Sequence, residues 1–334
     1  MPPADARGRR VRFAAALLAA AATAAQGSTD TAQIETTLGQ YQHENRPQLN
    51  LSFTPVGVPI PAWGFGPVRD VGSGHSLGSV FMTSGTSTSD AVAANAVSVA
   101  NAAELSAALA AATDGDTIFL DVGDYGSLKL QGVHKDITLL ADPDNPASFG
   151  AMRLDDVSGL TLDGLAFDFV YEEKMGTKTF LTPFTVHDSR NITIRNSSFE
   201  GDDAYGTGTV IDGYGFARAF ELRRSENVEI LDNAFHGFAN GMKLGGSMNT
   251  VVRGNDIHDM GSDGIQMVLM SDTVIEGNHF HDFRTPPGSG YHSDFIQLLG
   301  GGEKIPTSGL TIRYNLFTFD EGGSQVIFLS NSDD

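Results

Sequence analysis

The feature that most constrains the fold is a nine-residue pattern that recurs along the second half of the chain. Six copies begin at Gly159, Asn191, Asn227, Asn249, Asp272 and Gly309, and a weaker one begins at Asp136. Copies without an insertion between them start 22 or 23 residues apart. Two or three short strands with their turns fill that length, so the repeat predicts one coil of a parallel β-helix.

A second short strand accompanies the repeat. An apolar residue stands seven positions before five of the copies and returns twice more; these residues are Met152, Phe184, Phe220, Met242, Ile265, Ile296 and Ile327. Upstream, the segment from Asn101 to Thr113 predicts a short amphipathic helix. Asn101 and Glu104 have capping-box spacing, and Leu105, Leu109 and Ala112 share one helical face. We expect this helix to cover the first coil.

Stacked coils place equivalent residues in columns, about 4.8 Å apart. The ninth position of the repeat predicts an inward ladder of Phe167, Phe199, Phe235, Ile257, Phe280 and Phe317. The seventh position predicts an asparagine ladder at a turn, made of Asn233, Asn255, Asn278 and Asn315. Both columns are interpreted as structural. His258, His279 and His281 lie near one turn and are expected to stack on the surface.

Composition excludes several classes of function. The formal net charge of -20 repels nucleic acid, so no nucleic-acid partner is expected. The absence of cysteine excludes a disulfide framework and a thiolate nucleophile. Stability must therefore come from buried apolar side chains. We expect a monomer.

The N-terminus has the order of a secretory signal peptide. Arg7, Arg9, Arg10 and Arg12 precede an apolar run over 13–25 that ends in small residues. The predicted organisation is a signal peptide (1–26), a low-complexity leader or linker (27–97) and a β-helix (98–334). The protein is then secreted, extracellular or periplasmic, with no integral membrane segment in the mature chain. Two alternatives stay open: a start codon placed too early, and a fragment truncated at the C-terminus.

The repeats resemble those of the pectin-lyase-like superfamily. The similarity is carried by NVEILDNAF, NTVVRGNDI and DTVIEGNHF, preceded by GMKLGGS or DGIQMVLMS, and it extends over about Asn101 to Asn331. It implies an all-β fold, a single-stranded right-handed parallel β-helix with a short N-terminal capping helix. It also implies a function drawn from polysaccharide lyases, alginate C5-epimerases, glycoside hydrolases and non-catalytic surface proteins, because fold alone does not select among them.

Outward positions of the second strand form the candidate binding row. Alternation places a polar side chain of each coil in one column, which contains Arg153, Thr185, Glu221, Lys243, Gln266 and Gln297. Three long insertions leave one corner beside it: 17 residues separate Phe167 from Phe184, 21 separate Phe199 from Phe220, and 16 separate Phe280 from Ile296. Loops on a rigid scaffold often carry function, so a groove is expected there. The predicted substrate-binding residues are Glu221, Gln266, Gln297, Arg153, Tyr214 and Arg284.

The sharpest hypothesis is β-elimination or epimerisation of a uronic acid. Both reactions need a base that removes the C5 proton, a cation beside the carboxylate and a proton donor. Lys243 is the predicted base. Arg218 or Arg223 is the predicted neutralising cation, and Tyr291 or His292 the predicted proton donor.

Resemblance to the superfamily also suggests calcium as a cofactor. Asp263 and Asp294, in the matching strings SDGIQ and SDFIQ, are the predicted metal ligands, although calcium usually takes 6 to 8 oxygens. The alternative for these residues is a structural role in holding turns. Lys243 likewise has a structural alternative, as the partner of Glu221 in a solvated pair.

The chain departs from two family patterns. It lacks the Asp-Pro-His string of alginate epimerases and the Gly-His-Gly and Arg-Ile-Lys strings of polygalacturonases. These departures weigh against an epimerase of the alginate type and against a glycoside hydrolase that uses paired carboxylates. Two hypotheses therefore remain: a polysaccharide lyase or C5-epimerase acting on an acidic polysaccharide, and a non-catalytic β-helix that binds glycans or decorates the cell surface.

Overall fold

A computed structural model provides the structure, which describes residues 50–51, 96–178, 180–300, 307–319 and 325–329. All of these residues fall in one of the two compact units into which the chain divides. The predicted signal peptide (1–26) and almost all of the predicted leader (27–97) lie outside the described residues. Within the described ranges, no helix is long and apolar enough to cross a membrane.

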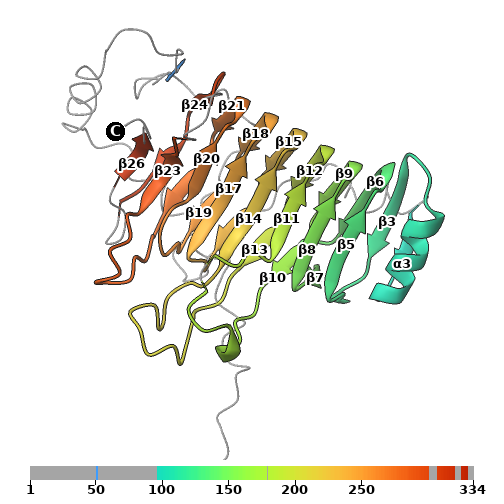
Figure 1. Ribbon diagram of the computed structural model, residues 1–334. Coiled ribbons are helices and arrows are strands. Elements are labelled where there is room, and N and C mark those ends of the chain that lie inside the picture. Colours follow the sequence, from blue (N-terminus) through green and yellow to red (C-terminus); the bar gives the residue numbers. More distant parts are fainter. Residues whose placement is uncertain (1–49, 52–95, 179, 301–306, 320–324, 330–334) are drawn as a thin grey trace, which may run out of the picture. The chain divides into compact units, whose positions relative to one another are not determined.

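Three parallel sheets, named A, B and C, make up the described structure, and each coil passes through them in that order (Figure 1). Sheet A contains, in spatial order, β1 (Asn50–Leu51), β24 (Thr311–Arg313), β21 (Ser271–Glu276), β18 (Met248–Arg253), β15 (Glu226–Leu231), β12 (Arg190–Arg195), β9 (Ser158–Asp163), β6 (His134–Ala141), β3 (Asp116–Leu120) and β2 (Val97–Val99). The first seven residues of the nine-residue repeat cover most of a sheet A strand and the turn that follows it, and the last two lie in the sheet B strand.

Sheets B and C complete each coil. Sheet B contains β25 (Leu316–Phe317), β22 (His279–His281), β19 (Asp256–His258), β16 (Ala234–His236), β13 (Ser198–Glu200), β10 (Ala166–Asp168), β7 (Ala147–Phe149) and β4 (Gly123–Asp124). Sheet C contains β26 (Gln325–Leu329), β23 (Asp294–Leu298), β20 (Ile265–Val268), β17 (Asn240–Gly245), β14 (Arg218–Arg223), β11 (Phe184–His187), β8 (Ala151–Asp155) and β5 (Ser127–Gln131). The predicted parallel β-helix is therefore confirmed.

Helix α3 (Ala102–Ala111) lies at the end of the stack beside β3 (Figure 1). Asn101 caps it, because its side-chain oxygen accepts hydrogen bonds from the backbone N–H groups of Ala103 and Glu104. Glu104 accepts in return from the backbone N–H of Ala100, which completes a capping box. The helix buries Leu105 against the first coil. The predicted capping helix is confirmed, with bounds two residues inside the expected segment at its C-terminal end.

The aromatic column fills the interior as predicted. Parallel pairing places Phe149, Phe167, Phe199, Phe235, Ile257, Phe280 and Phe317 in one register. The ring centroid of Phe199 lies 4.5 Å from that of Phe167 and 4.4 Å from that of Phe235. Stacked aromatic pairs contribute about 0.5 to 1.5 kcal/mol beyond the area that they bury. This column is therefore a main source of cohesion between coils.

The asparagine column forms at the turn between sheets A and B, also as predicted. The side-chain oxygen of Asn255 accepts from both nitrogens of Asn233, at 3.0 and 3.1 Å, and Asn278 accepts in the same way from Asn255. A further column, which the repeat pattern did not suggest, lies at the turn between sheets C and A. There Ser225 and Ser247 each accept a backbone N–H from the preceding coil.

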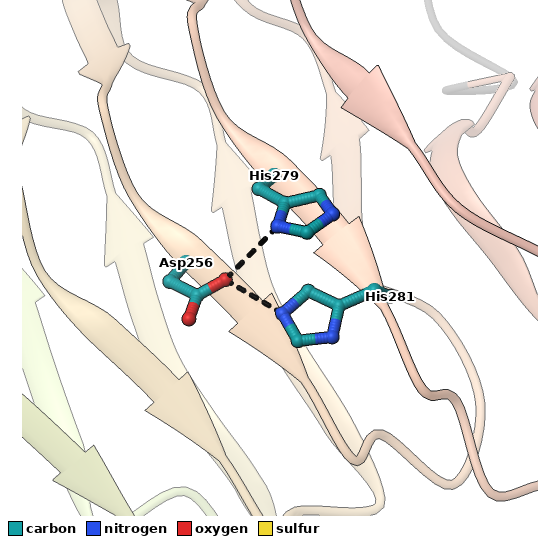
Figure 2. Close-up of side chains that lie close together, drawn as sticks. All are labelled: Asp256, His279 and His281. Atoms are coloured by element: carbon teal, nitrogen blue, oxygen red, sulfur yellow. Dashed lines mark hydrogen bonds and ion pairs between the residues drawn. The ribbon is translucent and has the colours of Figure 1, made fainter. Parts of the chain in front are cut away.

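Histidines stack on the outer surface of sheet B, as expected. The rings of His236 and His258 lie 5.0 Å apart, and those of His258 and His281 also lie 5.0 Å apart. His279 stands beside His281, with ring centroids 4.1 Å apart (Figure 2). The three named strands β16, β19 and β22 supply this column because they pair in register.

Candidate functional site

The predicted polar row exists on sheet C. Parallel pairing aligns Lys129, Arg153, Thr185, Glu221, Lys243, Gln266, Gln297 and Phe328 in one column. The inward neighbours Phe220 and Leu222 on β14 are fully buried, so Glu221 between them points outward. The same alternation holds for Lys243 between Met242 and Leu244. Lys243 therefore lies on the outward face between Glu221 of one coil and Gln266 of the next.

The surroundings of Lys243 lower the pKa of its amine. Burial lowers the pKa of Lys243, the charge of Arg218 lowers it further, and Arg223 acts in the same direction against the opposing charge of Glu221. Across the described residues, no hydrogen bond or ion pair holds the ammonium group. The predicted surface pair with Glu221 is therefore not formed, and the amine remains available to a ligand.

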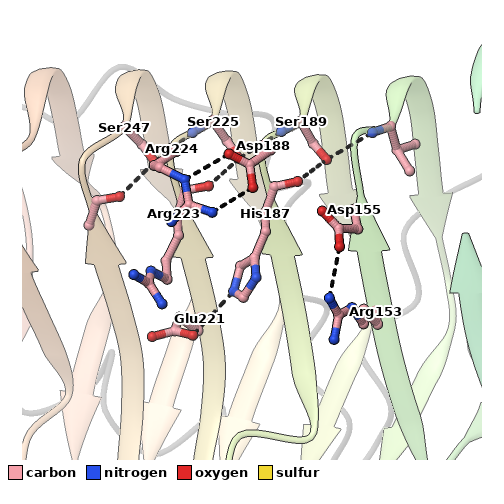
Figure 3. Close-up of polar contacts among 12 residues, drawn as sticks. Arg153, Asp155, His187, Asp188, Ser189, Glu221, Arg223, Arg224, Ser225 and Ser247 are labelled. Carbon is pink, nitrogen blue, oxygen red and sulfur yellow. Dashed lines mark hydrogen bonds and ion pairs between the residues drawn. The ribbon is translucent and has the colours of Figure 1, made fainter. Parts of the chain in front are cut away.

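Glu221 has a different partner. Its Oε2 lies 3.2 Å from Nε2 of His187, one coil away (Figure 3). His187 pairs in register with Arg223, so both stand in the next outward column of sheet C. His187 was not among the site residues predicted from the sequence, although its place in the repeat, two residues after Thr185, could have identified it. His187, Glu221 and Arg223 thus form a second group of ionisable side chains beside Lys243.

A further column lies where the sheet C strands begin. Arg218 on β14 pairs in register with Asn240 on β17, three residues before Lys243. Asp294 on β23 occupies the equivalent position, three residues before Gln297 and two coils after Asn240. Arg218, Asp263 and Asp294 are all buried. The Nε–H of Arg218 has no hydrogen-bond acceptor among the described residues. Burial lowers the pKa of Arg218, against the opposing charges of Glu221 and Asp263. The structure therefore brings three predicted site residues to one corner.

The two aspartates are linked to the polar row. Oδ1 of Asp263 accepts the backbone N–H of Asp294 at 3.0 Å, and its Oδ2 accepts Nε2 of Gln266 at 2.6 Å. Oδ2 of Asp294 accepts Nε2 of Gln297 at 3.2 Å. Burial raises the pKa of Asp263 to about 6, and burial also raises the pKa of Asp294. The carboxyl groups therefore orient the two glutamine amides.

This pair of aspartates does not fit calcium. Three of the four carboxylate oxygens already accept hydrogen bonds, and burial disfavours the charged form that calcium requires. The remaining oxygen, Oδ1 of Asp294, lies 3.8 Å from Nδ1 of His292. Calcium takes 6 to 8 oxygen ligands, and this geometry supplies one. No step below depends on a metal at this position.

The buried Asp263 predicts a dependence of stability on pH. Its pKa in the folded chain is about 6, above the ordinary value of 3.8, so the folded state holds the proton more tightly. The stability that Asp263 contributes should then be fully present below about pH 3.8 and be lost as pH rises through 6, by up to about 3 kcal/mol at 1.36 kcal/mol per pKa unit. Asp263→Asn should flatten this decline, while Asp144→Asn, on an exposed turn, should leave it unchanged. Urea unfolding between pH 4.5 and 7.5 measures the slopes, and equal slopes for wild type and Asp263→Asn would refute the prediction.

Three long loops leave the corner between sheets B and C, as predicted. They cover 169–183, which contains the short 3-10 helix η2 (Glu173–Met175), then 201–217 and 282–293. Arg284 of the third loop donates from Nη2 to Oδ1 of Asp203 in the second loop at 2.8 Å, and its Nε lies 3.2 Å from Oδ1 of Asp259. Arg284 therefore fixes the loops to each other, and its contact with a substrate stays a prediction.

The other loop residues are placed as follows. In the second loop, the backbone carbonyl oxygen of Tyr214 accepts a hydrogen bond from the backbone N–H of Ala204 at 2.9 Å, which holds the two ends of the loop together. Tyr291 is exposed, and His292 lies beside Asp294 at the corner of sheet C. Arg153 stands at the other end of the row, where it donates to Asp155 at 2.8 Å (Figure 3). The structure thus gathers Lys243 with Glu221, the two arginines and the aspartate corner, and leaves Arg153 apart from them.

Two surface hollows lie elsewhere on the described chain. One is lined by α3 and β5, and the other follows the asparagine positions that begin the repeats on sheet A, among them Asn191, Asn227 and Asn249. The groove expected above sheet C stays a prediction.

Comparison with known proteins agrees with the coil architecture. Residues 181–333 match the family model of the right handed beta helix region. Similar solved structures include an alginate lyase from Paenibacillus sp. (14% identity, 71% of this chain and 74% of that chain, TM-score 0.40). A pectate lyase follows (12% identity, 68% and 72%, TM-score 0.34), as does the A-module of a mannuronan C-5 epimerase from Azotobacter vinelandii (13% identity, 66% and 81%, TM-score 0.31). No curated protein matches the sequence.

The family match and the order of strands in the three sheets both indicate a β-helix. The matched range begins in the first long loop, and the unmatched coils before it continue the same three sheets. The described residues form a right-handed parallel β-helix, and residues 181–333 match the family model of this architecture.

Proposed function

We propose that the outward face of sheet C binds an acidic polysaccharide and that the protein is a polysaccharide lyase or C5-epimerase. The observation that carries the proposal is Lys243, an outward lysine whose amine has no hydrogen bond or ion pair among the described residues and whose pKa is lowered by burial and by Arg218. An amine in this environment is neutral in a larger fraction of molecules and can accept a proton.

The reaction begins with the transfer of the uronic acid C5 proton to the neutral amine of Lys243. The electron pair of the C5–H bond moves into the adjacent carboxylate, whose extra negative charge needs a nearby cation. Arg223 is the better candidate for direct contact because it is exposed, whereas Arg218 is buried and acts through its charge. In this proposal Arg223 contacts the substrate carboxylate, and Arg218 adds positive charge from its buried position.

Two outcomes follow from the same intermediate. In the lyase, the electron pair returns to form a C4=C5 double bond while the C4–O4 bond breaks, and a donor protonates the leaving oxygen. His292, at the aspartate corner, and the exposed Tyr291 are the proposed donors. In the epimerase, a proton returns to C5 from the opposite face and the glycosidic bond survives. Gln266 and Gln297, oriented by Asp263 and Asp294, hold the sugar chain through their amides.

We also propose that the protein is exported from the cell. The four N-terminal arginines, followed by the apolar run over 13–25, support export through a cleavable signal peptide. Export would place the protein where polysaccharides of this kind are found. A mature chain that begins near residue 27 after secretion would support this part of the proposal.

A panel of polysaccharides tests the activity. Alginate, polygalacturonate and a neutral glucan are incubated with the protein. A lyase produces the ultraviolet absorbance of an unsaturated uronate from one of the two acidic polymers and none from the glucan. An epimerase in deuterated water instead incorporates deuterium at C5 without that absorbance. Binding of an acidic polymer with neither product would overturn the enzymatic proposal and favour a non-catalytic glycan-binding protein.

A further inference from the structure

The outer face of sheet B carries a group of ligand atoms that the proposed reaction does not use. On β22, His279 and His281 flank the fully buried Phe280, so both imidazoles point outward. Asp256 on the adjacent β19 pairs in register with His279. Two histidines and one carboxylate are thus presented side by side on rigid strands.

The near atoms of these three side chains converge. Nε2 of His281 lies 2.8 Å from Oδ1 of Asp256, and Nδ1 of His279 lies 3.7 Å from the same oxygen (Figure 2). All three possible ligand atoms fall within 4.8 Å of one another. Other histidine–carboxylate pairs nearby, such as His258 with Asp259, do not assemble a third ligand among the described residues.

The far nitrogens of the two imidazoles are held by other oxygens. Nδ1 of His281 lies 2.7 Å from Oδ2 of Asp282, and Nε2 of His279 lies 3.1 Å from Oγ1 of Thr318. In the metal-free chain, Nε2 of His281 donates to Oδ1 of Asp256. When a metal ion displaces that proton and the far nitrogens keep theirs, the two near nitrogens present lone pairs to the ion. Such outer hydrogen bonds are the usual way in which proteins orient histidine ligands of a metal. This orientation is a second observation, independent of the proximity of the three residues.

We propose that Asp256, His279 and His281 bind a zinc ion. Two imidazole nitrogens and one carboxylate oxygen form a three-ligand zinc set, and a water molecule can take the fourth position because all three side chains are partly exposed. Calcium, which takes oxygen ligands, does not suit this donor set. The site lies on sheet B, whereas the proposed catalytic face is sheet C, so the two proposals stand independently.

Calorimetry on the untagged, metal-stripped full chain tests the site. Titration with zinc chloride should show one tight site per chain, and calcium chloride should show none. His279→Ala and His281→Ala should each weaken zinc binding at least 100-fold, and Asp282→Asn should weaken it about 10- to 100-fold as expected for an outer hydrogen-bond partner. His134→Ala is the matched control, because His134 is exposed and, within the described part of the chain, pairs with one carboxylate, that of Asp156, at 3.6 Å.

Thermal unfolding gives a second readout that does not depend on enzymatic activity. Zinc should raise the melting temperature of the wild type and of His134→Ala, because a ligand that binds only the folded state stabilises it. It should not raise that of His279→Ala, which lacks one of the three proposed ligands. Absence of zinc binding by the wild type, or equal binding by the wild type and His279→Ala, would overturn the proposal and leave the three side chains as an ion-pair cluster.

Discussion

Replacement of Lys243 by alanine should lower the rate of product formation by about 10²- to 10⁴-fold, the usual contribution of a general base. The amine of Lys243 is the group on sheet C that is outward, unpaired among the described residues and shifted toward neutrality by burial and by Arg218. Its removal leaves the C5 proton without an acceptor. The measurement is the initial rate of unsaturated uronate formation, or of deuterium incorporation at C5, on the polymer that the wild type accepts.

The control for this variant lies in the same column. Lys129 on β5 is also an outward lysine of sheet C, four coils away from Lys243. Lys129→Ala should retain the wild-type rate, and Lys243→Ala should still bind the polymer and keep the wild-type circular dichroism spectrum. Retention of more than a tenth of the wild-type rate by Lys243→Ala would remove this lysine from the mechanism, even if the protein proves to be a lyase.

Replacement of Phe199 by alanine should destabilise the β-helix by about 3 to 5 kcal/mol, the cost of deleting a buried phenylalanine side chain. Phe199 is fully buried and stacks on Phe167 and Phe235, so the substitution leaves a cavity between three coils. At 2 to 4 °C per kcal/mol for a unit of this size, the melting temperature should fall by roughly 6 to 20 °C. Thermal unfolding followed by circular dichroism measures the change.

A second phenylalanine provides the comparison. Phe180 has the same side chain but is 79% exposed in the first long loop. Phe180→Ala should therefore shift the melting temperature by no more than a degree or two. Equal destabilisation by the two substitutions would show that the aromatic column does not contribute the cohesion assigned to it.

The repeat was sufficient to predict the coil and its columns. One residue of slip would turn every inward side chain outward, so the apolar positions fix the register of all three sheets. That constraint is why Phe199 and Asn255 lie where the pattern placed them, and why Lys243 pairs in register with Glu221 and Gln266. Insertions between the ninth position and the next strand likewise predicted which corner carries the long loops.

The repeat did not predict which hydrogen bonds and ion pairs the side chains form. A repeat says which residues share a column, but a long side chain can choose among several neighbours. The structural alternative for Lys243 paired it with Glu221, but Glu221 pairs with His187. Arg284 is held by Asp203 and Asp259, two contacts that the repeat did not indicate, and its contact with a substrate stays a prediction. Both outcomes depend on residues in other coils or loops whose spacing the pattern does not fix.

The repeat also did not predict how deeply the polar residues at the edge of sheet C are buried. Asp263 and Asp294 were predicted as calcium ligands because their strings match, but the corner that contains them is closed to solvent. There the carboxyl groups use their oxygens to hold Gln266, Gln297 and a backbone N–H. The alternative considered from the sequence, that they hold local structure through side-chain hydrogen bonds, agrees better with this geometry.

The most direct test is the position of an acidic oligosaccharide on the protein. A crystal of Lys243→Ala soaked with an oligosaccharide of the preferred polymer should show a uronate bound over β14, β17 and β20, with its carboxylate toward Arg223 and its C5 above residue 243. Density for the sugar on sheet A or sheet B, with the sheet C face empty, would contradict the account.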